Sequence, residues 1–229
     1  MRNISFLSLC IFALVLLSCW PKKNDPINLT YRLLYNNDSI GYMTCHIKLN
    51  PNGGIVYEET QTNGFTEKSW SYFDPNFRMD SVRIQGNIGD HKIDCFTKKE
   101  GDSLKGYVGF PVRDNKPNPI VLSETHDVYF ERSVALFIMP SELLKQEEHQ
   151  MFQYNATTGK FYSIEVKTNL ELETTKIPSG EYNCQTITYS GGVAKQKFYI
   201  NNKNIIKIVI IGQPYVYELI SKSSENSEL

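Results

Sequence analysis

The chain lacks a strong net charge, because 24 basic and 25 acidic residues leave a formal charge of −1 over 229 residues. A near-neutral protein has no electrostatic reason to favour nucleic acid, so no nucleic-acid partner is predicted. The chain also lacks an apolar run of about 18 residues, the length that suggests a membrane-spanning helix. Its ordinary composition, with 41% hydrophobic residues, excludes a disordered tail or a collagen-like fibre.

Motifs of the common enzyme classes are missing as well. No Gly-x-Ser-x-Gly, Gly-x-x-x-x-Gly-Lys-Ser/Thr or His-Glu-x-x-His occurs, which removes support for hydrolase elbows, P-loops and zinc proteases. No Cys-x-x-Cys occurs, and His46, His91, His126 and His149 have no metal-binding spacing. We therefore predict no catalytic residue, cofactor or metal, and keep a hydrolase without a recognisable motif as the enzyme alternative.

The N-terminus carries the most informative pattern that is present. Arg2 precedes an uncharged, mostly apolar run from Ile4 to Leu17, which is too short to span a bilayer but suits the core of a signal peptide. The run ends in Leu16-Leu17-Ser18-Cys19, which resembles the lipobox of bacterial lipoproteins, although a small residue is usual where Leu17 stands. The resemblance implies cleavage before Cys19 and attachment of diacylglycerol and palmitate to it. A plain secretory signal is the alternative.

These signals divide the chain into four parts. Residues 1–18 are expected to be the signal peptide, 19–28 a lipidated tether containing two prolines, 29–220 a single β-rich domain and 221–229 a flexible polar tail. Lipid on Cys19 would anchor the protein to a membrane of the bacterial cell envelope, with the outer membrane expected and the periplasmic or surface face left open.

Alternation with period two dominates residues 29–220 and predicts half-buried strands joined by hairpin turns. Leu29, Tyr31 and Leu33 alternate with polar residues, and the same pattern continues after the Asn36-Asn37-Asp38 turn. Between Met79 and Val82 the apolar phase changes, which predicts a β-bulge. A later run from Ile205 to Ile211 is apolar on both faces except at Lys207, and a strand of that kind should be covered on both sides.

One stretch in the middle of the chain has the period of a helix instead. Phe130, Val134, Phe137 and Ile138 recur at helical spacing, after a connection rich in proline. We expect a helix between about Phe130 and Lys145 that packs as a plug against the concave face of the sheet. The predicted fold is therefore mainly β, a curved antiparallel sheet or incomplete β-barrel of about 9–11 strands with one mid-chain helix as plug.

Three cysteines remain in the predicted mature domain after Cys10 leaves with the signal peptide and Cys19 takes lipid. An exported protein can form disulfides, and these three thiols could make at most one internal bridge. Cys45 and Cys95 lie on apolar strand faces, where a free thiol behaves as a small hydrophobic group. We expect Cys45, Cys95 and Cys184 to be reduced and buried, with one disulfide as the alternative.

The order of the later segments resembles a known exported family. A Pro-rich connection and a helical stretch are followed by Ile177-Pro-Ser-Gly-Glu-Tyr-Asn-Cys184, which opens a strand. A strand, a turn and a second strand then follow in the run Lys197-Phe-Tyr-Ile-Asn-Asn-Lys-Asn-Ile-Ile-Lys207. This order is similar to the domain of unknown function 3108 over roughly residues 29–220. The resemblance implies a fold like that of the periplasmic lipoprotein carriers LolA and LolB, an incomplete barrel with an apolar interior around a helical plug. It implies no catalytic residue.

Two functions follow, and the sequence does not decide between them. The first is a lipid-anchored envelope protein that binds an apolar ligand or assists envelope maintenance, with Phe130, Val134, Phe137 and Ile138 bordering the apolar interior. The second is a non-enzymatic scaffold with a filled core that contacts an envelope protein. The 26 Tyr and Phe residues and the two Trp residues of the chain fit either function, since aromatic rings can line a pocket or fill a core.

Overall fold

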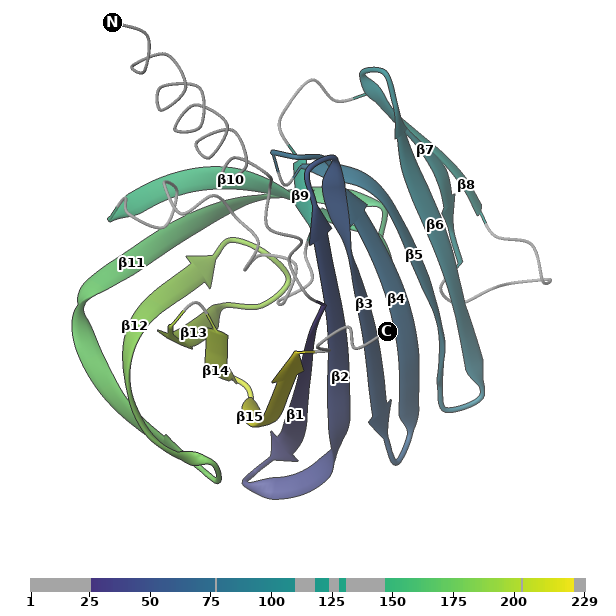
Figure 1. The fold of residues 1–229 in the computed structure, drawn as a ribbon. Helices are drawn as coiled ribbons and strands as arrows, with labels where there is room; N and C mark the ends of the chain where they lie inside the picture. The colour runs from purple at the N-terminus through teal and green to yellow at the C-terminus, as the bar shows by residue number, and fades with distance from the viewer. Residues whose placement is uncertain are drawn as a thin grey trace, which may run out of the picture.

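A computed structural model describes residues 26–76, 78–109, 118–123, 128–130, 147–202 and 204–224 of the chain. These residues form a single sheet of 15 β-strands, and no helix occurs among them (Figure 1). The first eight strands are β1 (Ile27–Tyr35), β2 (Asp38–Asn50), β3 (Gly53–Thr62), β4 (Phe65–Phe73), β5 (Met79–Ile88), β6 (His91–Glu100), β7 (Ser103–Val108) and β8 (Asn118–Ser123). The others are β9 (Val128–Phe130), β10 (Glu148–Asn155), β11 (Lys160–Ile177), β12 (Gly180–Ser190), β13 (Gln196–Asn201), β14 (Asn204–Ile210) and β15 (Tyr215–Ser224).

The strand order follows the chain almost without interruption. It runs from β8 down to β1, passes to β15 through the β1–β15 pair, and continues down to β9. All neighbours are antiparallel except β9 and β10, which are parallel. The sheet is open, because β8 and β9 stand at its two edges. The prediction of a curved, mainly antiparallel β-fold is thus confirmed, while the closed form of a barrel is absent from the described strands.

The sheet curls so far that its two ends overlap. Thr97 of β6 pairs with Val82, so both side chains lie on the inner face of the curled sheet. In β10 the side chain of Met151 lies on this inner face, and Tyr154, three residues later, lies on the outer face because side chains alternate along a strand. The hydroxyl groups of Thr97 and Tyr154 are nevertheless hydrogen-bonded at 2.9 Å. The inner face of β6 therefore covers the outer face of β10. In Figure 1 the sheet curls until β9 comes close to β5, which it contacts.

Two irregularities adjust the strands to this curvature. Phe73 pairs with Met79 and Tyr72 with Ser81, so Asp80 is the extra residue of a β-bulge, as the phase change between Met79 and Val82 predicted. In β11 three residues, 170–172, stand opposite one residue of β12. Leu170 and Leu172 are consequently 57% and 67% exposed, although their spacing follows that of the buried residues earlier in β11.

Several expectations need correction. The structure has 15 strands rather than 9–11. Phe130 is the last residue of β9 and so is not helical, while the rest of the predicted helix, 131–145, lies outside the described residues. β1 begins at Ile27, inside the expected tether, and β15 continues to Ser224, inside the expected tail, where the two strands pair.

The strand β14 also differs from the expectation of cover on both faces. Ile205 and Ile206 are both buried because Ile206 is an extra residue at a register shift opposite β13. Beyond the shift, Ile208 and Ile210 are buried while Val209 remains half-buried. The bulge therefore explains why two consecutive isoleucines are buried, and a covering layer on the outer face is not required.

Candidate binding site on the concave face

The register of the strands defines one continuous inner face. Cross-strand pairing links Ile187 of β12 to Phe198, Phe198 to Ile208, and Ile208 to Tyr217 of β15. The same face continues through Leu33 of β1 to β2 and onward to β6. We call this surface, on strands β1–β6 and β10–β15, the concave face.

One half of the concave face is apolar and tightly packed. Phe198, Ile208 and Tyr31 are at most 2% exposed, and the Phe198 ring lies 4.8 Å from that of Tyr189 between centroids. Tyr31 donates a hydrogen bond from its hydroxyl group to the carbonyl oxygen of Ile205, at 3.2 Å. This satisfies the one polar atom of a side chain that is otherwise surrounded by the core.

The other half carries polar residues in a row across β2, β3 and β4. Cys45 stands opposite Glu58, and Glu58 stands opposite Ser69, whose hydroxyl group donates to Glu58 Oε2 at 3.2 Å. Glu58 is only 5% exposed. Burial raises the pKa of the Cys45 thiol, and the nearby Glu58 carboxylate raises it further. Cys45 is therefore held as a neutral thiol and has none of the electropositive surroundings that activate a nucleophilic cysteine.

Within the part of the chain that the structure describes, four inward-facing side chains have buried polar atoms without a hydrogen-bond partner. They are Ser71 on β4, His149 and Gln153 on β10, and Thr168 on β11. Burial lowers the pKa of His149, so this ring is neutral at neutral pH. Buried polar groups in proteins are almost always hydrogen-bonded, and an unpaired one costs about 1–3 kcal/mol. Such atoms on a concave surface are candidates for pairing with water or with a ligand.

The predicted site residues are only partly placed by the structure. Cys19 lies outside the described residues, as do Val134, Phe137 and Ile138. Phe130 ends β9, which pairs with β10 beside the unpartnered polar groups. Sequence reasoning missed Ser71, Gln153 and Thr168, because isolated polar residues in a strand look like solvent-facing ones. Glu58 was missed for the same reason.

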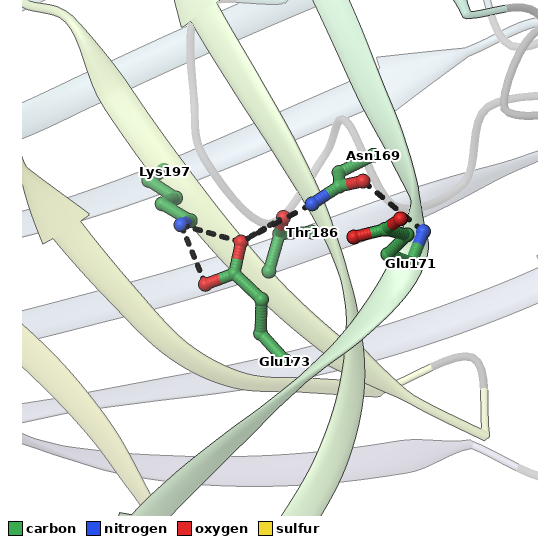
Figure 2. Close-up of polar contacts among 5 residues, drawn as sticks. All are labelled: Asn169, Glu171, Glu173, Thr186 and Lys197. Atoms are coloured by element: carbon green, nitrogen blue, oxygen red, sulfur yellow. Dashed lines mark hydrogen bonds and ion pairs between the residues drawn. The ribbon is translucent and has the colours of Figure 1, made fainter.

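A separate polar network lies on the opposite face of the sheet, at the irregular part of β11 (Figure 2). Lys197 Nζ is 2.8 Å and 2.7 Å from the two carboxylate oxygens of Glu173, and Thr186 donates to Glu173 Oε1 at 3.1 Å. The amide of Asn169 also donates to Oε1, at 3.4 Å, and its oxygen accepts from the backbone N–H of Glu171. These bonds join β11 to β13 across β12 and hold the irregular segment in place.

The described part of the chain offers little for metal chemistry or thiol chemistry. Within it, no group of three or more His, Cys, Asp or Glu side chains is arranged to hold a metal ion. Cys45, Cys95 and Cys184 are free and buried, which confirms the expectation of reduced thiols. None of the described residues belongs to a helix long and apolar enough to cross a membrane.

Comparison with known proteins adds no constraint on function. No family model matches the chain, and no curated protein or solved structure shows a significant similarity to it. The resemblance to the domain of unknown function 3108 and to the lipoprotein carriers therefore stays a prediction.

The Glu173–Lys197 pair makes a testable contribution to stability. The hydrogen bond from Lys197 lowers the pKa of Glu173, against a smaller opposing effect of burial. A lowered carboxyl pKa stabilises the fold above the unfolded value of about 4.3, and this stabilisation is lost as the pH falls through the folded value. Because the pair is partly exposed, Glu173→Gln should cost about 0.5–1 kcal/mol at pH 7 and much less at pH 3.

Urea unfolding at the two pH values measures this difference. Lys167→Met is the matched control, since Lys167 makes its ion pairs with Glu148 and Glu165 in a much more exposed setting. Its free energy of unfolding should stay unchanged. An equal loss for Glu173→Gln at pH 3 and pH 7 would show that the charge of Glu173 is not what stabilises the irregular strand.

Proposed function

We propose that this protein is a non-enzymatic, lipid-anchored protein of the bacterial cell envelope whose concave face binds a largely apolar ligand. The observation that carries the proposal is a set of buried polar atoms on Ser71, His149, Gln153 and Thr168, which have no partner among the described residues and lie on a concave face of which one half is apolar. A ligand with an apolar body and a polar group would satisfy both parts of this surface. Binding sites for small molecules commonly combine apolar walls with a few such polar contacts.

A plug over part of the concave face fits the topology of the edge strands. Because β9 and β10 are parallel, the chain between them has to return along the sheet, and such a connection is usually a helix. The outer face of β10 is occupied where Tyr154 meets Thr97 of β6. We infer that residues 131–146 return over the inner face, where the predicted stripe Val134, Phe137 and Ile138 would cover apolar surface.

A scaffold with a filled core is the second candidate. It is favoured by the nearly complete burial of Tyr31, Phe198 and Ile208, as expected for a filled core. Under this alternative the plug alone would cover the concave face, and the protein would act through its outer surface on an envelope protein.

Removal of the unpartnered hydroxyl groups separates the two candidates. If a bound ligand satisfies them, Ser71→Ala and Thr168→Val should each lose copurifying ligand and destabilise the fold by about 1 kcal/mol. If nothing satisfies them, the same variants should gain stability and release nothing. Thermal unfolding and mass spectrometry of extracted small molecules give the two readouts. Ser69→Ala is the control, because its hydroxyl group already has Glu58 as a partner and its removal should cost stability in both cases.

The plug is tested at Phe137. A fully buried Phe137 at the concave face would make Phe137→Ala cost about 3–5 kcal/mol, through lost transfer energy and a residual cavity. If Phe137 borders a ligand instead, the loss should be much smaller and ligand retention should change. A loss below about 1 kcal/mol with unchanged retention would mean that the segment does not face the sheet.

The lipid anchor is tested at Cys19. Cys19→Ala should release the protein from membranes or leave it as an uncleaved precursor, because the thiol that accepts diacylglycerol is gone. Membrane fractionation and the mass of the N-terminal peptide measure both effects. A variant that is cleaved and partitions like the unchanged protein would rule out lipidation at this residue, without bearing on the concave face.

A further inference from the structure

A second concave feature lies on the outer face of the sheet, away from the site proposed above. It is a hollow of about 360 Å³ over β3, β4 and β5. Six of its lining side chains can form hydrogen bonds and point outward, namely Glu59, Gln61, Thr66, Lys68, Gln85 and Asn87. We call this feature the outer groove. Its volume lies near the lower end of the range of about 300–1,000 Å³ found for small-molecule sites.

A glycine allows the strands to approach closely beneath the groove. Gly86 of β5 lines it, and a Cβ atom at this position would lie 2.0 Å from the carbonyl oxygen of Thr66 on β4. Any other residue would push the two strands apart. Gly86 therefore fixes a close approach of the β4 and β5 backbones at the groove.

Three aromatic residues lie next to residues that line the groove, without lining it themselves. Tyr42 of β2, which is 53% exposed, stands directly opposite Gln61. On the other side lie Tyr57 and Trp70, with ring centroids 5.3 Å apart, each two residues along its strand from a groove residue. The hydroxyl group of Tyr57 donates to Glu59 Oε2 at 2.7 Å, which ties Tyr57 to the polar lining.

The polar lining itself has groups to spare for a ligand. The side-chain amides of Gln61 and Gln85 make no hydrogen bond within the part of the chain that the structure describes, and each offers both a donor and an acceptor. Of the outward-facing lining residues, only Glu59 and Lys68 are charged, and Lys68 Nζ lies 3.4 Å from Glu59 Oε1. Because these two charges pair with each other, the outward lining has no excess of positive charge that would favour phosphate, nucleic acid or another anion.

We propose that the outer groove binds a neutral oligosaccharide. Sugars present hydroxyl groups that need paired donors and acceptors, and they present apolar C–H surfaces that pack on aromatic rings. The amides, carboxylate and hydroxyl group of the groove meet the first requirement, and the exposed ring of Tyr42 beside Gln61 meets the second. This proposal uses the face of the sheet opposite to the concave face, so it stands or falls independently of the ligand proposed there.

The chain contains only two tryptophans, which makes the groove accessible to fluorescence. In full-length protein carrying Trp20→Phe, Trp70 is the sole tryptophan. Hexasaccharides of glucose, N-acetylglucosamine and mannose are titrated against this protein in detergent micelles, with calorimetry run in parallel. At least one sugar should give a saturable change in emission or heat. Gln85→Ala and Tyr42→Ala should weaken its binding by about tenfold or more, which corresponds to about 1.4 kcal/mol.

Gln150→Ala is the matched control, because Gln150 is an exposed, outward-facing glutamine on the distant strand β10. It should bind the sugar as tightly as the unchanged protein. The proposal is overturned if none of the three sugars gives a saturable signal by either method. Equal binding by Gln85→Ala and Gln150→Ala would also overturn it, as would preferential binding of the anionic polymer heparin.

Discussion

The shape of this protein depends on one contact between the two ends of its sheet. A sheet of 15 strands exposes unpaired edges and has to curl or split, because each strand is twisted against the next. Here the inner face of β6 covers the outer face of β10, and the hydrogen bond between Thr97 and Tyr154 joins them, 57 residues apart in the chain. The overlap encloses the concave face without closing a hydrogen-bonded barrel.

The overlap also explains why polar side chains inside the curl are buried. Once the sheet encloses them, Ser71, Gln153 and Thr168 lose access to bulk water, and their polar atoms have no partner among the described residues. Glu58 is buried there as well, with Ser69 as one of its partners. A surface that served only for packing would be more stable with apolar side chains at these positions. The proposed ligand would account for these polar groups by pairing with them.

Much of the fold could be read from the alternation of apolar and polar residues, but polar inner positions hid the rest. Period two revealed β1, β2 and the strands near the C-terminus, and the phase change at Met79 and Val82 revealed the bulge at Asp80. The strand β4 was not visible, because Glu67, Ser69 and Ser71 are its inward residues and break the expected pattern. The same polarity that concealed β4 is what marks the concave face as a candidate site.

The irregularity of β11 and the outer groove could not be predicted from the sequence. The spacing of Leu170 and Leu172 matches that of the buried residues Ile164 and Val166, yet the three-residue irregularity of β11 turns both leucines to solvent. Nothing in the local sequence reports the pairing register that causes this. The outer groove was equally hidden, since it arises where Gly86 lets β5 approach the backbone of β4, and the residues around it come from three different strands.

A double-mutant cycle across the overlap tests the account most directly. Thr97→Val, Tyr154→Phe and the double variant are unfolded in urea, and the coupling free energy is taken from the three differences. An overlap held by this hydrogen bond predicts a coupling of about 0.5–1.5 kcal/mol, because each single change leaves a buried hydroxyl group without its partner. Strictly additive effects would show that β6 does not cover β10, and the concave face would then be open to solvent.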